Sequence, residues 1–469
     1  FFGSIFSFFV DVQKEERIKV LLLTTSFFFL IGAYTVVKEL KDSIFASVVG
    51  ADYQPKAKMI VIFFLIPAIF FYSKLVDILK RHNLLYFYSV LYSLIGFAFV
   101  YFMAHPTIGL ANTVASPDRY FGWLFYFFIE SYPPFMVGVF WAFANSVTSP
   151  VSVRRNYTIM ISGSKLGGML SAMGALWILN AKAKAGCGMF SCVVNHQILI
   201  GCSSAALLIV AFLVYLLIKL VPQKNLHGYE AGHIAEEELD KPENKESAFM
   251  GMISGFLLLI KNPYVLGIFS IGFFYELINQ VFSYERLVIG QKITATASEF
   301  SSYLFEQIFL VHAIGFIISL LGTRAIISFL GERRSLLVVP VLIGFTLLYF
   351  IFYPSEGILY VFVLSRSLNY ALTQPLRESL YIPTIRDVQF KSKSWIDGFG
   401  TKFAKTCGAT FNNFVKNMSH SAHSFANSTL FLSTAILWIL SSYWLGKRFE
   451  RAISTNEVIG KDEILGEKN

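Results

Sequence analysis

Charged side chains interrupt the most apolar stretches of this 469-residue chain. A charge at the centre of a bilayer costs at least about 2.5 to 3.5 kcal/mol, so such residues would not persist facing lipid. We therefore expect them to line a water-filled path. They are Lys38, Glu39, Lys41, Asp42, Glu130, Lys165, Glu276, Arg324, Arg366, Arg377 and Glu378. Cations outnumber acids in this set, which favours an anion as the molecule that moves.

The run Lys38-Glu39-Leu40-Lys41-Asp42 follows a long apolar stretch. Lys38 and Lys41 are three residues apart and share one face of a helix, and Asp42 is four residues beyond Lys38, near enough to pair with it. The spacing predicts a pair of cations that binds phosphate, with acidic neighbours that keep the empty site near neutral. The alternative is the outer end of a helix whose lysines reach into water.

Glu130 lies in Phe-Ile-Glu-Ser-Tyr-Pro-Pro, without a cation nearby along the chain. A residue of another helix, a proton or a substrate must compensate its charge, which indicates a functional carboxylate. The alternative is a structural ion pair beside a proline kink. Lys165 lies among small residues in Ser-Gly-Ser-Lys-Leu-Gly-Gly, a pattern that allows either a cation at a cavity wall or close helix packing.

The C-terminal half carries a second set of charges. Arg366, Arg377 and Glu378 surround Tyr370, and Lys402 follows in the next apolar stretch. Arg377 and Glu378 either contact substrate or pair structurally near the cytoplasmic mouth. Three charges in an earlier stretch predict a gate or a proton-coupling site: Glu276, Glu285 and Arg286. Metal-ligand spacing and a nucleophile–base set are both missing from the sequence, so we expect no metal, no cofactor and no enzymatic activity.

The elements that position these residues are membrane-spanning helices. A mean hydropathy of +0.59 with 15% charged residues is typical of an all-α polytopic membrane protein. Apolar segments about 20 residues long predict twelve spans, at 19–46, 57–76, 84–104, 121–147, 156–180, 196–220, 263–287, 302–328, 335–353, 357–381, 397–419 and 425–446.

Positive charge recurs in alternate connections between these spans, which predicts that both termini are cytoplasmic. The formal charge of +9 is therefore spread along the chain, and we expect no nucleic acid partner. A polar stretch divides the spans six and six. We expect an N-terminal half at 1–221, a cytoplasmic linker at 222–247, a C-terminal half at 248–450 and a cytoplasmic tail at 451–469. Two six-helix halves around a charged cavity form the architecture of major facilitator transporters, here a monomer in a cell (inner) membrane.

Several motifs resemble those of one family. The run from Val37 to Asp42 is similar to Leu-Arg-x-x-Lys-Asp, and Glu130 with the later run from Phe140 to Asn145 is similar to a Glu and Phe-Trp-x-x-Ala-Asn. The run from Tyr370 to Pro383 resembles Tyr-Ser-Leu-Phe-Asp-Pro-Thr-Lys-Glu-Met-Ala-Tyr-Ile-Pro, and the run from Lys391 to Asp397, which includes Lys393, resembles Lys-Gly-Lys-x-x-Ile-Asp. These motifs belong to the nucleotide transporters typified by the ATP/ADP translocases of obligate intracellular bacteria and plastids.

The resemblance implies exchange of nucleotides by alternating access. Together with the charges in the apolar stretches, it predicts substrate contacts at Lys38, Lys41, Asp42, Glu130, Asn145, Lys165, Tyr370, Arg377, Glu378 and Lys402, and gating or coupling at Glu276, Glu285, Arg286, Lys391, Lys393 and Asp397. Trp141 or Tyr370 would stack on the base.

Departures from the motifs leave alternatives open. Asn369 stands where the family commonly has Lys, Gln374 replaces Asp, Arg377 replaces Lys, and Phe282 aligns with a family Glu. Proton-driven net import of a nucleotide or of another phosphorylated or dinucleotide anion is therefore the alternative. A membrane-embedded enzyme and a structural or receptor role are weaker.

Overall fold

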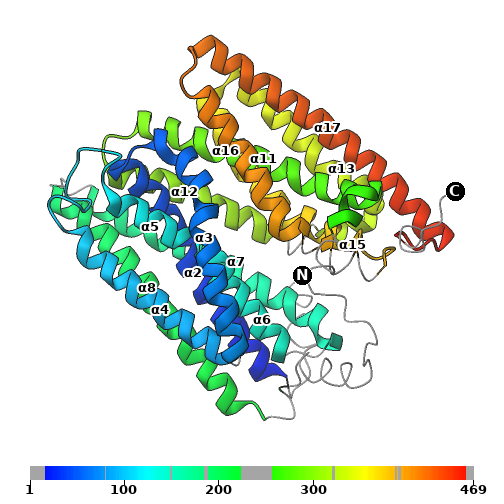
Figure 1. Ribbon diagram of the computed structural model, residues 1–469, viewed down its shortest axis with the longest axis horizontal. Helices are drawn as coiled ribbons and strands as arrows, with labels where there is room; N and C mark the ends of the chain where they lie inside the picture. The colour runs from blue at the N-terminus through cyan, green and yellow to red at the C-terminus, as the bar shows by residue number, and fades with distance from the viewer. Residues whose placement is uncertain are drawn as a thin grey trace. The chain divides into compact units, whose positions relative to one another are not determined.

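The computed structural model describes residues 16–79, 81–147, 150–183, 189–222, 226, 256–318, 323–385, 388, 392–393 and 395–460. The elements in these ranges are helices, apart from one β-bridge between Thr384 and Ile459 (Figure 1). Most of the expected linker at 222–247 lies outside the described residues. So do Lys391 and the side chains of Asn145 and Arg324.

The described chain folds into two compact units, the first of which comprises Phe1–Lys241 and Gly290–Ala313. Its helices are α2 (Arg17–Val48), η1 (Ala51–Tyr53), α3 (Gln54–Ile78), α4 (Arg81–Met103), α5 (Tyr120–Glu130), η2 (Pro133–Val137), α6 (Gly138–Val147), α7 (Pro150–Ala183) and α8 (Met189–Leu220). Helix α2 packs against α7, α8 and α5, and α4 packs against α8 (Figure 1).

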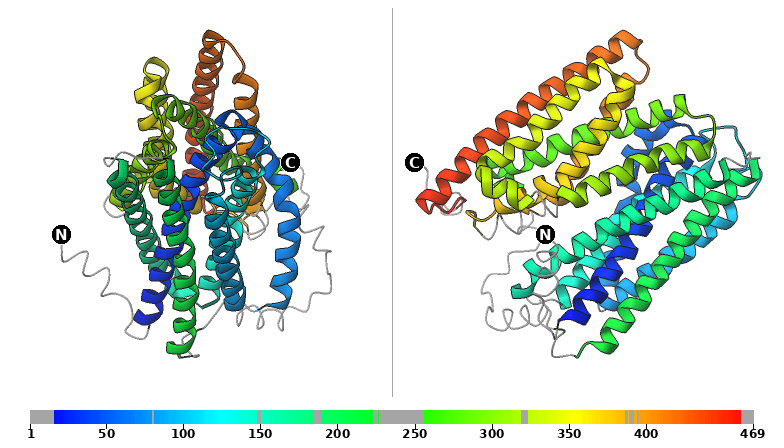
Figure 2. Two further views of the ribbon diagram at one scale, coloured as in Figure 1. Left: turned by 90° about the vertical axis from the view of Figure 1, so that its left-hand side faces the viewer. Right: turned by 180° about the vertical axis from the view of Figure 1, so that it is seen from behind.

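The second unit comprises Pro242–Ile289 and Ile314–Asn469. Its helices are α11 (Pro263–Ile293), α13 (Thr323–Phe352), α14 (Pro354–Leu368), η5 (Asn369–Thr373), α15 (Gln374–Ser379), η7 (Trp395–Gly400), α16 (Thr401–Val415) and α17 (His420–Thr455). Helix α13 lies along α17 and α14 (Figure 2). The last residues of α11 and most of α12 (Ala297–Ile317) belong to the first unit.

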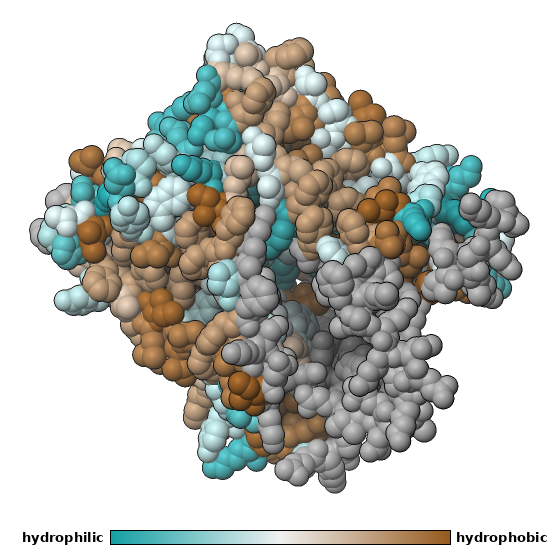
Figure 3. Space-filling model, in the orientation of Figure 1, coloured by the Kyte–Doolittle hydropathy of each residue, from teal (hydrophilic) through white to brown (hydrophobic). Residues whose placement is uncertain are grey.

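Length and composition mark these helices as membrane-spanning. Among the described residues, nine helices are long and apolar enough to cross a bilayer. Large side chains on their outer faces are exposed, among them Tyr101, Phe212 and Phe345. Figure 3 shows broad hydrophobic areas on the face it presents. The sequence prediction of an all-α multi-pass membrane protein is confirmed, while the count of twelve spans stays a prediction.

Glycines allow α2 and α7 to pack closely. An added Cβ at Gly167 would lie 2.3 Å from the carbonyl oxygen of Phe28, and one at Gly163 would lie 2.4 Å from the Thr24 side chain. Backbones that approach this closely exclude larger residues, as small-residue interfaces of membrane helices commonly do. The contact fixes the position of α2, which carries the lysines expected to bind phosphate.

Three π-helical segments lie beside expected site residues. Segment η2 begins three residues after Glu130, η5 contains Tyr370, and η7 contains Asp397. A π-helical turn widens the helix locally and frees it from the regular ladder of hydrogen bonds, and such turns are frequent at functional sites. The sequence indicated the proline pair at 133–134 as a kink, but not the π-helical geometry.

Candidate functional site

The first unit brings two lysines onto one carboxylate oxygen. Lys41 Nζ lies 2.5 Å from Glu130 Oε1, and Lys58 Nζ lies 2.6 Å from the same atom. Asp42 adds a second acid 3.2 Å from Lys41. We call Lys41, Lys58, Glu130 and Asp42 the lysine–glutamate cluster. Its two cations and two acids balance.

The lysine–glutamate cluster is largely buried. The side chains of Lys41, Lys58 and Glu130 are 5%, 16% and 12% exposed. The Lys41 ammonium also lies 4.6 Å from the ring centre of Tyr126, a distance at which the ring attracts a cation. Gln54 donates a long hydrogen bond of 3.5 Å to the Tyr126 hydroxyl. Burial makes each of these charges dependent on its partners.

Three helices place the cluster. Lys41 lies in α2, Lys58 lies one turn after Gln54 on α3, and Glu130 is the last residue of α5. Tyr126 lies four residues before Glu130, on the same face of α5. In this conformation Glu130 therefore forms the ion pairs with neighbouring helices that the structural alternative predicted. A role in transport requires that these pairs open when substrate binds.

The other expected residues of the first unit lie on α2 or on helices that contact it. The side chain of Lys38 is 25% exposed and approaches Glu39 at 3.9 Å. Lys165 is partly buried on α7, the helix packed against α2. Trp141 packs edge-on against Phe27, with ring centres 5.0 Å apart. That contact places Trp141 in an aromatic cluster within the first unit.

Two ion pairs organise the region after α14 in the second unit. Arg377 Nη2 lies 2.8 Å from Asp397 Oδ1, and Lys393 pairs with Glu378. Arg377 and Glu378 were candidates to pair with each other. In the described structure, Arg377 contacts Asp397 within η7, and Glu378 contacts Lys393 just before η7. Tyr370 is 42% exposed, as an aromatic side chain that receives a base would be.

A second set of charges lies along α11. Lys405 of α16 approaches Glu276 at 3.5 Å. Glu285 accepts a hydrogen bond of 3.1 Å from Asn427 and lies 3.2 Å from His423, both on α17. Arg286 is only 2% exposed. Lys402 is partly buried on α16.

Sequence reasoning missed Lys58. The motif near Lys41 drew attention to α2, and Lys58, the second residue of the span expected at 57–76, was not among the candidate residues. The available signal was the pair Gln54 and Lys58, four residues apart on one face of α3. Tyr126, four residues before Glu130, was also missed, for the lack of a charge to mark it.

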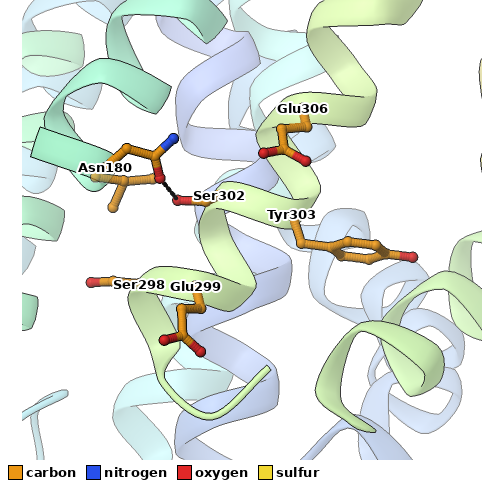
Figure 4. Close-up of a pocket in the computed structure, with 7 residues that line it drawn as sticks. Asn180, Ser298, Glu299, Ser302, Tyr303 and Glu306 are labelled. Atoms are coloured by element: carbon orange, nitrogen blue, oxygen red, sulfur yellow. Dashed lines mark hydrogen bonds between the residues drawn. The ribbon is translucent and has the colours of Figure 1, made fainter. Parts of the chain in front are cut away.

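A separate cavity of about 260 Å³ opens at the end of α7 and the start of α12 (Figure 4). Its lining includes Asn180, Ser302, Tyr303 and two exposed acids, Glu299 and Glu306. Ser302 donates a hydrogen bond of 3.0 Å to Asn180. The expected site residues are absent from its lining, and two carboxylates disfavour an anion there.

Comparisons with known proteins match nearly the whole chain to one family of transporters. The family model described as TLC ATP/ADP transporter matches residues 1–362 and 357–449. The chain is 24% identical to ADP,ATP carrier protein 1 of Chlamydia pneumoniae, over 98% of this chain and 97% of the relative. It is 23% identical to ADP,ATP carrier protein 4 of Rickettsia bellii, over 95% and 93% respectively.

Solved structures of transporters share the fold. A D-xylose–proton symporter matches with a TM-score of 0.60 at 13% identity, over 92% of this chain and 97% of the symporter. A nucleoside transporter matches with a TM-score of 0.53 at 11% identity, over 93% and 100%. At these identities the likeness shows the fold alone. It confirms the predicted major-facilitator-like fold class.

Proposed function

The chain belongs to the TLC ATP/ADP transporter family, and from that membership we infer that it exchanges ATP and ADP across a membrane by alternating access. It is a multi-pass membrane protein and a transporter rather than an enzyme. Full-length similarity to two ADP,ATP carrier proteins supports nucleotides as the substrates.

The observation that carries the site assignment is the shared oxygen of Glu130. Two ammonium groups converge on one anionic oxygen atom at 2.5 and 2.6 Å. A phosphate oxygen carries the same charge and accepts the same hydrogen bonds, so Glu130 occupies the place that a substrate phosphate would take. In our proposal, the phosphate displaces Glu130 from Lys41 and Lys58, and Glu130 returns when the nucleotide leaves.

Exchange follows from the cost of moving charge. Reorientation of the empty carrier moves the charged residues of its interior past an apolar barrier, which is unfavourable even where Glu130 balances the lysines. The remaining expected residues complete the proposed substrate path, and they are Lys38, Asp42, Asn145, Lys165, Tyr370, Arg377, Glu378 and Lys402.

The pairs at Lys393–Glu378 and Arg377–Asp397 are proposed to gate the second unit, together with Lys391, Glu276, Glu285 and Arg286. We also propose that the carrier is a monomer without a nucleic acid partner, with both termini and the linker at 222–247 in the cytoplasm. Basic residues in the last turn of α8 and in the C-terminal third of α17, such as Lys219 and Lys447, support that orientation.

Exchange by the Lys41→Ala variant tests the site. In liposomes loaded with ADP, we expect the wild-type protein to take up labelled ATP and the variant to lose most of that uptake. Lys56→Ala serves as the matched control, because Lys56 is exposed on the same helix as Lys58. Equal uptake by Lys41→Ala and the wild type would remove the lysine–glutamate cluster from the substrate path.

A further inference from the structure

Two buried guanidinium groups share one aromatic ring in the second unit. The Cζ atom of Arg286 lies 4.0 Å from the ring centre of Phe362, and that of Arg366 lies 4.2 Å from the same centre. Arg286 is 2% exposed and Arg366 is 7% exposed. Two like charges held on one ring repel each other.

Arg366 donates two side-chain hydrogen bonds. Its Nε donates to Asn279 Oδ1 at 2.9 Å, and its Nη2 donates to Ser283 Oγ at 3.1 Å. Both acceptors are neutral, so they orient the guanidinium group without cancelling its charge. In the described part of the chain these bonds use Nε and Nη2, which leaves Nη1 available to an incoming oxygen.

The carboxylates nearest along α11 have other contacts. Glu285 contacts Asn427 and His423 on α17. Glu276 accepts a hydrogen bond of 3.4 Å from Asn279 and lies 3.5 Å from Lys405. Neither is among the hydrogen-bond acceptors of Arg366 described above.

A partly exposed polar face of α11 leads to Arg366. Glu276, Asn279 and Ser283 are spaced by three and four residues, so they lie on one side of the helix, and all three are partly exposed. Lys405 lies at the Glu276 end of this face and Arg366 contacts its other two residues. An anion that follows this face would pass from Lys405 to Arg366.

We propose that Arg366 provides a phosphate-binding subsite in the second unit, which takes the phosphoryl oxygens of a nucleoside di- or triphosphate. Guanidinium groups suit this ligand because their planar donors match two oxygens of one phosphoryl group. The natural ligand of this subsite rests on the proposed function. The lysine–glutamate cluster is a separate group of residues in the first unit. The chemical consequence of the arginine subsite is that the carrier discriminates nucleotides by their number of phosphates.

The test measures binding of four probes by the purified full-length protein: ATP, AMP, adenosine and inorganic triphosphate. We compare the wild type with Arg366→Gln and Arg366→Lys. A hydrogen bond to a charged group contributes about 1.5 to 3 kcal/mol, so Arg366→Gln should weaken ATP and triphosphate binding by about tenfold to a hundredfold. Adenosine binding should not change, and Arg366→Lys should recover part of the loss.

Arg333→Gln is the matched control, since Arg333 is a partly exposed arginine of the same unit that pairs with Glu450 at 2.8 Å. The proposal is wrong if a monodisperse Arg366→Gln protein binds ATP and triphosphate as tightly as this control. It is also wrong if adenosine binding falls as much as ATP binding, because the arginine would then shape the protein rather than hold phosphate. If Arg366→Gln does not fold, the ratio of ATP affinity to adenosine affinity is measured for Arg366→Lys and Phe362→Leu. A ratio below that of the wild type supports the subsite, and an unchanged ratio overturns it.

The outcome separates this subsite from the transport function. Triphosphate binding that depends on Arg366, in a wild-type protein that does not exchange ATP for ADP, would keep the subsite and overturn the proposed function. Wild-type exchange with Arg366 variants that bind and transport as the control does would keep the function and overturn the subsite.

Discussion

Glu130 is held between two cations in a buried environment, and this contact decides how the residues around it are interpreted. An ion pair in such a place contributes little stability by itself, because desolvation of both charges offsets their attraction. The ion pair has a clearer function if a substrate phosphate can displace the carboxylate. The predictions for Lys58 and Glu130 distinguish a structural role of the ion pair from a role in substrate binding.

Replacement of Lys58 tests the residue that sequence reasoning missed. We expect Lys58→Gln to raise the ATP concentration for half-maximal exchange by about tenfold or more, because a charge-assisted hydrogen bond to phosphate is lost. Exchange assays in liposomes check this. Lys56→Gln is the control on the same helix, and a Lys58→Gln protein indistinguishable from it would exclude Lys58 from substrate binding.

Replacement of Glu130 leaves Lys41 and Lys58 close together without their shared acid. Breaking a buried ion pair typically costs about 3 kcal/mol or more, so we expect Glu130→Gln to lower the melting temperature of the empty carrier. ATP should then raise that temperature by more than it does for the wild type, since phosphate restores the missing charge. Thermal unfolding with and without ATP measures both effects.

Glu306→Gln is the matched control for this experiment, because Glu306 is an exposed acid on α12. If ATP stabilises Glu130→Gln less than it stabilises the wild type, the carboxylate contacts substrate directly instead of standing in for phosphate.

At the scale of single residues, the sequence predicted which charged residues belong to the candidate site better than it predicted which residues they contact. Lys41, Asp42 and Glu130 were identified because charges in apolar segments are costly. Their contacts depend on how α2, α3 and α5 pack, which one sequence does not show. For the same reason Arg377 and Glu378, adjacent in the chain, were candidates to pair with each other, although each contacts a residue near η7.

At the scale of elements, close packing of α2 against α7 sets the position of Lys41. We expect Gly167→Ala to destabilise the protein by about 1 to 3 kcal/mol, because the added methyl group would collide with the Phe28 backbone. Gly174→Ala, in the same helix, should be tolerated, since nothing lies within 4 Å of the added Cβ. Melting temperatures of the two variants in detergent check this, and equal values would mean that α2 and α7 do not need their close contact.

The apolar segments predicted where the long helices lie, because hydropathy reports length directly. They did not predict the π-helical segments η2, η5 and η7. Those turns depend on hydrogen bonds that shift by one residue, and residue types near Pro133 signal only that a regular helix is interrupted. Helix boundaries and the region around Tyr370 therefore required the structure.

At the scale of the whole molecule, the departures from family motifs bear on coupling. Phe282, which stands where the resemblance places a glutamate, is 1% exposed and stacks on Phe431 with ring centres 4.7 Å apart. A phenylalanine side chain cannot bind a proton. Glu276 and Glu285 are the candidates for proton coupling in the second unit, and that possibility distinguishes net import from exchange.

The decisive measurement is uptake of labelled ATP by the wild-type protein in liposomes loaded with ADP, with ATP or with buffer alone. We expect rapid uptake only against internal nucleotide, and no acceleration by a proton gradient. Equal uptake into vesicles that contain buffer alone, driven by such a gradient, would contradict exchange and establish a net importer.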